Sequence, residues 1–162
     1  NILFILIHDN SKKILDTIKS RCIKFNFNLT FNECINIANK NTKKNIHDLL
    51  NLDLINHYNT VGDFINLINF SSVSNIDIFN LNLKNFLINI IDNKYYKKNI
   101  FIKNNVYKFI DFYFLKLINL NKSDKKISFF YSKFTKKIHF LKKFNLDEEA
   151  FFIEFKTTIL NG

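Results

Sequence analysis

The pattern of apolar and polar positions changes character near residue 28. Apolar residues are continuous from Ile2 to Ile7, which is typical of a buried strand in a parallel sheet. Turn-forming residues follow, and a short amphipathic helix is predicted over 12–20. Residues 22–27 then alternate with the two-residue period of a strand that has one wet face. Residues 1–28 are therefore predicted to be the end of an α/β domain and not a complete one.

From Thr30 onward the period is helical. Thr30 and Glu33 match a capping box, in which a hydroxyl and a carboxylate satisfy the first free N–H groups of a helix. That helix is predicted to run to about Asn39. Further helices at 42–50, at 53–57 and from Gly62 on would complete a small helical domain over 29–72.

A cluster of serines at 71–74 is the best candidate for a linker. Longer segments follow it, with apolar residues at i, i+3, i+4 and i+7. They predict helices at about 75–93, 105–121, 124–144 and 147–160. The predicted fold class is mainly α: an α/β remnant, a small helical domain, and an all-α domain over 75–162.

The net charge of +10 has two interpretations. A basic chain favours acidic partners such as nucleic acid. The abundance of Asn, Lys, Ile and Phe also matches an AT-rich coding sequence, which would raise lysine without any selection for binding. The chain has no Met and begins with Asn1, so we expect it to be the C-terminal part of a longer protein. The opening apolar segment is too short to span a membrane, and a cytoplasmic location is predicted.

Most familiar chemical motifs are missing from the sequence. The chain has two glycines, Gly62 and Gly162, so it contains no glycine-rich loop that could surround a phosphate group. Cys22 and Cys34 lack the CxxC spacing of a metal site and are predicted to be buried free thiols. The histidines (His8, His47, His57, His139) are scattered, and only His8 follows a predicted buried strand, where α/β folds place ligand-binding groups. We expect no bound metal or cofactor.

Arg21 is distinctive because it is the only arginine beside 23 lysines. The guanidinium group has a planar set of donors that binds phosphate or carboxylate through two hydrogen bonds, which lysine cannot do. A single arginine in such a chain indicates a position where lysine would fail. The alternatives are a chance survivor of the coding bias or a buried ion pair.

The residues around Arg21 carry a family resemblance. The segment from Ile5 to Cys22 has an apolar run, a polar turn, and then Leu15-Asp16-Thr17-Ile18-Lys19-Ser20-Arg21-Cys22. It resembles the end of the AAA+ ATPase domain in clamp-loader subunits, where a short helix leads to a Ser-Arg-Cys motif. Among these subunits it is most similar to the delta-prime type of bacterial DNA polymerase III.

The resemblance implies a role for each matching residue. Ser20, Arg21 and Cys22 match the Ser-Arg-Cys motif, and Arg21 would be the arginine finger that reaches the ATP held by a neighbouring subunit. Thr17 would help to shape the same loop. His8 lies about where the family has its sensor-1 residue, although a small hydroxyl or Asn is usual there. Asp16 replaces the proline that usually precedes Thr17.

A second, weaker match begins at Val61-Gly62-Asp63. It resembles the start of the last helix of the lid domain, where ATP-binding members carry a nucleotide-contacting arginine. This chain has Asp63 near that place and no arginine after Arg21, as expected for a non-hydrolysing delta-prime type. The resemblance implies a helical lid at 29–72 and a collar domain at 75–162. The implied partners are the gamma/tau and delta subunits and, through the complex, the sliding clamp and primer-template DNA.

Two other hypotheses stay open. The first is an ATP-hydrolysing subunit of the gamma/tau type, with its phosphate-binding loop in sequence before Asn1. The second is a basic helical module that binds nucleic acid, which requires lysines gathered on one continuous face. The phenylalanines of the last domain fit either subunit packing or an ordinary core.

Overall fold

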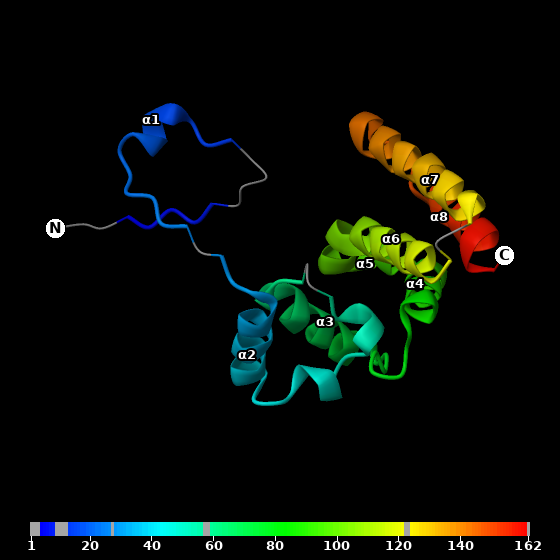
Figure 1. The fold of residues 1–162 in the computed structure, drawn as a ribbon, viewed down its shortest axis with the longest axis horizontal. Coiled ribbons are helices and arrows are strands. Elements are labelled where there is room, and N and C mark those ends of the chain that lie inside the picture. Colours follow the sequence, from blue (N-terminus) through cyan, green and yellow to red (C-terminus); the bar gives the residue numbers. More distant parts are fainter. Residues whose placement is uncertain (1–3, 9–12, 27, 57–58, 122–123, 162) are drawn as a thin grey trace. The chain divides into compact units, whose positions relative to one another are not determined.

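The computed structural model describes residues 4–8, 13–26, 28–56, 59–121 and 124–161 (Figure 1). Its contacts divide the chain into two compact units, Asn1–Thr30 and Phe31–Gly162. The expected subdivision of the second unit into lid and collar stays a prediction.

The described part of the first unit contains one short helix, α1 (Asp16–Lys19). The strand predictions for 2–7 and 22–27 are wrong for the residues described there, since 4–8 and 22–26 form no strand. A strand needs a neighbouring chain to take up its N–H and C=O groups, and the described residues of this unit offer none. The apolar side chains of 4–7 are consequently exposed, with Ile7 at 96%.

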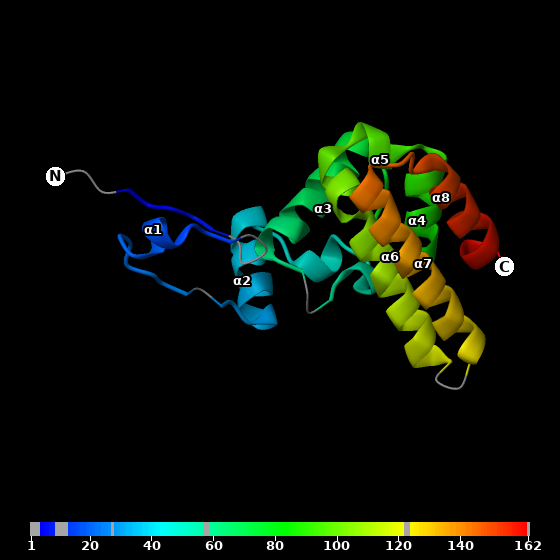
Figure 2. The same cartoon turned by 90° about the horizontal axis from the view of Figure 1, so that it is seen from above.

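The described part of the second unit consists of helices and the loops between them, without strands, which confirms the all-α prediction for this region (Figure 2). α6 contacts α4, α5 and α7, and it forms an antiparallel hairpin with α7. α2 packs against α3. The α-helices are α2 (Phe31–Thr42), α3 (Val61–Ser74), α4 (Leu83–Asp92), α5 (Tyr95–Lys98), α6 (Ile100–Leu120), α7 (Lys125–Phe144) and α8 (Glu149–Phe155), and α8 continues as a π-helical turn, Lys156–Leu160.

The serine cluster is part of a helix, so the predicted linker at 71–74 is wrong. These residues form the last turn of α3, where the hydroxyls of Ser72 and Ser74 donate to the carbonyls of Ile68 and Phe70. Such back-bonding lets serine remain inside a helix. The helix ends instead at Asn75, whose left-handed backbone (φ 53°) is a common helix C-terminus.

Two predicted helices are shorter in the structure because asparagine side chains set their starts. Asn82 accepts a hydrogen bond from the backbone N–H of Asn85, so α4 begins at Leu83 and not at 75. Asn45 caps the 3-10 turn Ile46–Asp48, which is all that forms of the helix predicted at 42–50. Of the helix predicted at 53–57, the described residues form only a 3-10 turn, Leu52–Leu54, and residue 57 lies outside the described part of the chain.

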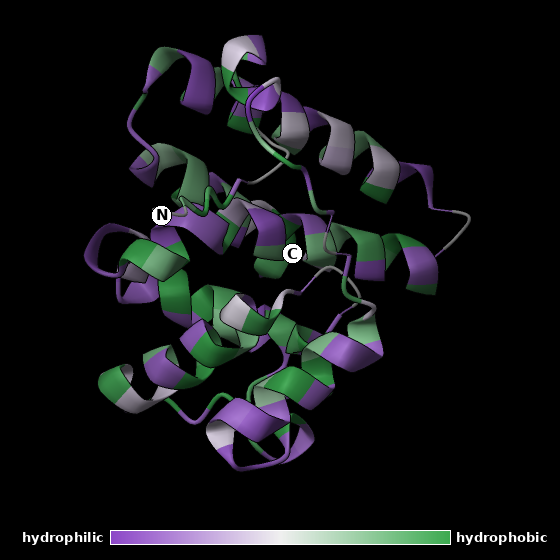
Figure 3. Ribbon diagram, turned by 90° about the vertical axis from the view of Figure 1, so that its left-hand side faces the viewer, coloured by the Kyte–Doolittle hydropathy of each residue, from purple (hydrophilic) through white to green (hydrophobic). Residues whose placement is uncertain are grey.

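The second unit has one continuous apolar core, which runs from Cys34 to Leu160. Hydrophobic and hydrophilic residues are mixed along the helices, as is typical of amphipathic helices that bury one face (Figure 3). Many phenylalanines belong to this core, and rings from three helices meet around Phe134. Cys34 is buried as predicted, but Cys22 is exposed, so the prediction of a buried thiol is wrong there.

Candidate functional site

Arg21 lies just after α1, and its side chain is exposed. Its backbone N–H donates to the carbonyl of Ile18 (3.1 Å), and that of Cys22 donates to Lys19 (3.4 Å). These bonds close the helix into a turn, which fixes the backbone at the motif. Among the described residues, no carboxylate forms an ion pair with Arg21.

The other residues of the motif surround the same turn. The hydroxyl of Ser20 donates to the carbonyl of Thr17 at 3.1 Å, so these two residues brace the end of α1. Lys19 pairs with Asp16 across the helix at 3.3 Å. Cys22 is exposed beside Arg21. The structure therefore brings Thr17, Ser20 and Cys22 together around the backbone that carries the arginine.

His8 does not have the predicted setting. Residues 4–8 form no strand and His8 is exposed, so it does not lie at the end of a buried strand. Its proposed sensor-1 role stays a prediction from the resemblance alone.

An exposed guanidinium with no ion-pair partner among the described residues can do one kind of chemistry. It can bind an anion from another molecule through two parallel hydrogen bonds, with its charge retained at any physiological pH. The arrangement is suited to stabilising negative charge.

Asp63, which occupies the region of the lid match, has a structural role. Its carboxylate accepts a hydrogen bond from the N–H of Thr60 (2.9 Å), while the Thr60 hydroxyl accepts one from the N–H of Asp63 (3.2 Å). This is a capping box at the start of α3. Asp63 also pairs with Lys108 of α6 at 2.9 Å. The Thr60–Asp63 spacing of a capping box is present in the sequence, but this cap was not among the sequence predictions.

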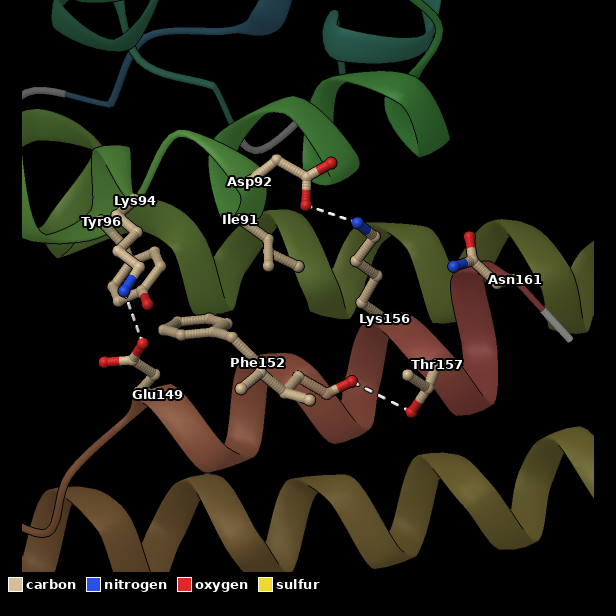
Figure 4. Close-up of a pocket in the computed structure, with 10 residues that line it drawn as sticks. Ile91, Asp92, Lys94, Tyr96, Glu149, Phe152, Lys156, Thr157 and Asn161 are labelled. Carbon is tan, nitrogen blue, oxygen red and sulfur yellow. Dashed lines mark hydrogen bonds and ion pairs between the residues drawn. The ribbon is translucent and has the colours of Figure 1, made fainter.

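A hollow of about 370 Å³ lies in the second unit between the end of α4, α5 and α8 (Figure 4). The rings of Tyr96 and Phe152 form its apolar wall, with their centroids 4.2 Å apart. Lys156 and Asp92 pair across its rim at 2.5 Å. The remaining lining residues are Ile91, Lys94, Glu149, Ile153, Thr157 and Asn161.

Glu149 organises the charges at one end of this hollow. Its carboxylate accepts hydrogen bonds from Lys94 (2.6 Å) and Lys97 (2.8 Å), and these two partners lower its pKa to about 2. The adjacent Glu148 accepts a hydrogen bond from the Tyr107 hydroxyl at 2.6 Å. Burial first, and then that bond, raise the pKa of Tyr107 far above its ordinary value.

These contacts join α5 and α6 to the start of α8. The sequence places acidic residues at 147–149, and helix-dipole complementarity explains them only in part. Their long-range lysine and tyrosine partners carried no sequence signal. Because the lysines and carboxylates of the hollow neutralise one another, it has no strong preference for a charged ligand.

Among the described residues, no group of three or more His, Cys, Asp or Glu is arranged to hold a metal ion. None of the helices in that part of the chain is both long and apolar enough to cross a bilayer.

Comparison with known proteins gives no relative on which to base a function. No family model, no curated protein and no solved structure matches this chain. The Ser-Arg-Cys segment and the geometry around it are therefore the features of this chain that bear on its function.

Proposed function

We propose that this chain is a non-hydrolysing clamp-loader subunit of the delta-prime type, which supplies Arg21 to the ATP site of a neighbouring subunit. The proposal covers the AAA+ remnant at 1–28, the lid at 29–72 and the collar at 75–162. ATP would be held by the neighbour, and the gamma/tau and delta subunits would be the direct partners. The protein would act in the cytoplasm during loading of the sliding clamp onto primer-template DNA.

One observation carries the proposal: the single arginine of the chain is exposed, lacks an ion pair among the described residues, and lies within Ser20-Arg21-Cys22. The exposure disfavours the alternative of a buried ion pair. A finger that acts in trans must be free to reach another subunit. Its guanidinium would then neutralise the charge that develops on the transferred phosphoryl group.

The turn after α1 supports this role physically. The bond between Ser20 and Thr17 and the backbone bonds of Arg21 and Cys22 hold the main chain in place while the arginine side chain stays in solvent. A pre-positioned donor loses less conformational freedom when it meets its anion. Lysine cannot replace the two parallel hydrogen bonds.

The test is reconstitution of the full-length protein with its clamp-loader partners. We expect Arg21→Ala to abolish most clamp loading onto primer-template DNA, and Arg21→Lys to restore little of it. Lys24→Ala is the matched control, because it removes an exposed positive charge three residues away. Clamp loading that is equal for Arg21→Ala and Lys24→Ala would refute the proposal.

A measurement of ATPase activity separates this proposal from the ATP-hydrolysing alternative. A non-hydrolysing subunit on its own is expected to show no ATPase activity in the full-length form. If the isolated full-length protein hydrolyses ATP, the gamma/tau type is correct instead.

A further inference from the structure

The helix α7 (Lys125–Phe144) has two faces of different chemistry. Its inner face packs into the core through Phe134 and Ile138, which are buried. Three large aromatic side chains point away from that core, since Phe129 is 66% exposed, Phe140 is 52% exposed and Phe144, which stacks on Phe140, is 56% exposed. An exposed phenylalanine is apolar surface that the fold of this unit does not use.

The same helix is strongly basic. Its sequence carries lysine at 125, 126, 133, 136, 137, 142 and 143, and it contains no acidic residue. Lys133 and Lys137 pair with Glu154 of α8. Lys125, Lys136 and Lys143 are exposed, and no carboxylate among the described residues forms an ion pair with them.

These three lysines and two of the exposed rings, Phe129 and Phe140, fall on one stripe. Lys125, Phe129, Lys136, Phe140 and Lys143 follow one another at intervals of four, seven, four and three residues, which keeps them on one side of a helix. We call these five residues the α7 outer face. Its two rings are separated by about 16 Å along the axis.

The nearby acidic groups leave this face positive. Asp124 is used as the cap of α7, where it accepts a hydrogen bond from the N–H of Lys126 at 2.8 Å. Asp111 of α6 is half-buried, and burial raises the pKa of its carboxyl group. Lys142 of α7 opposes this shift, but its effect is the smaller of the two. Glu154 is already shared between two lysines.

We propose that the α7 outer face binds single-stranded nucleic acid. Exposed aromatic rings provide surfaces on which unpaired bases stack, and interleaved lysines bind the phosphates between them. A duplex would offer the phosphates but keep its bases out of reach of the rings. This proposal does not depend on Arg21, which lies in the other unit.

A second copy of the chain would fit the α7 outer face less well than single-stranded nucleic acid does. The two rings do not form a continuous apolar ridge, since Lys136 lies between them. Pairing the face with itself would bring lysines against lysines, which costs free energy. A polyanion with aromatic groups fits both features at once.

The experiment is fluorescence anisotropy with a labelled 30-nucleotide oligo(dT) and the full-length protein, over a range of salt concentrations. The variant Lys125→Gln/Lys136→Gln/Lys143→Gln is expected to weaken binding at least tenfold. It should also reduce the slope of log K against log salt by about 2, because each phosphate contact on a single strand contributes about 0.7. The control Lys40→Gln/Lys84→Gln/Lys103→Gln removes the same charge from exposed positions outside α7.

The rings are tested separately with Phe129→Ala and Phe140→Ala, each expected to weaken oligo(dT) binding about tenfold. Both are surface changes, so circular dichroism should show an unchanged fold. A matched duplex should bind more weakly than the single strand.

Three results would overturn the inference. The lysine variant and its control could bind equally well, the phenylalanine variants could keep full affinity, or the duplex could bind as tightly as the single strand. Light scattering completes the test: a wild-type dimer that the phenylalanine variants convert to a monomer, without loss of oligo(dT) binding, would identify the face as a protein interface instead.

Discussion

At the scale of single residues, a few side chains join segments that are far apart in the chain. Glu149 is the clearest case, because it holds both Lys94 and Lys97 from more than 50 positions away. Phe134 is another, since it contacts rings of both α6 and α8. Their roles depend on partners that only the folded chain brings near.

The Glu149 contacts predict a pH dependence of stability. Lys94 and Lys97 lower the folded-state pKa of Glu149 from 4.5 to about 2. The stabilisation is therefore fully present above about pH 4.5 and is lost as the pH falls toward 2. We expect Glu149→Gln to destabilise the protein at pH 7 and to have no effect near pH 2, as measured by urea unfolding across this range. Asp48→Asn, an exposed control, should show no such convergence; a Glu149→Gln effect that is the same at both pH values would contradict the account.

Phe134 predicts a large cost on truncation. It is fully buried, and its ring centroid lies 5.5 to 5.9 Å from those of Phe155, Phe151 and Phe114. Phe134→Ala is expected to lower the free energy of unfolding by about 3–5 kcal/mol. Phe129→Ala on the exposed side of the same helix should change it by less than about 0.5 kcal/mol. Similar urea midpoints for the two variants would show that α7 is oriented differently.

At the scale of elements, the sequence predicted helices well and their ends poorly. The periodicity located α2, α6, α7 and the final helix to within a few residues. It did not predict that Asn45 and Asn82 are N-caps, which fix where the following helices begin. Asparagine is common throughout this chain, and its capping role depends on local backbone geometry. The strand predictions were wrong for a different reason. Alternating apolar residues favour a strand only when one of its faces is buried, and nothing in the described part of the first unit buries that face.

The start of α3 offers a test at this scale. The Thr60 hydroxyl and the Asp63 carboxylate satisfy each other's backbone N–H groups. Thr60→Ala is expected to lower the free energy of unfolding by about 1 kcal/mol, as for other caps. Thr135→Ala is the control, because its hydroxyl only bonds back to Tyr131 within α7. Equal stability of the two variants in urea titrations would argue against the cap.

At the scale of the whole molecule, the chain divides at Thr30. The described part of the first unit contributes no buried residue, whereas the core is continuous from Cys34 to Leu160. The sequence alone located Arg21 and its motif in the first unit. It could not show that the Arg21 side chain is exposed without an ion pair among the described residues, or that the second unit carries the α7 outer face. Those features depend on where the carboxylates lie after folding.

This division predicts that the second unit folds without the first. A protein of residues 31–162 is expected to keep its helical circular dichroism signal and to unfold cooperatively, at the same temperature as the full chain. The reason is that removal of 1–30 takes away no residue of the apolar core. Loss of the cooperative thermal transition would contradict the division.

The most direct test of the central claim is single-turnover ATP hydrolysis in the reconstituted clamp loader. An arginine finger acts on the transition state, so Arg21→Ala should slow hydrolysis at the neighbouring site by roughly 10³-fold while ATP binding is unchanged. Arg21→Lys should remain slow, and Lys24→Ala should match the wild type. Wild-type hydrolysis at that site in Arg21→Ala would contradict the account.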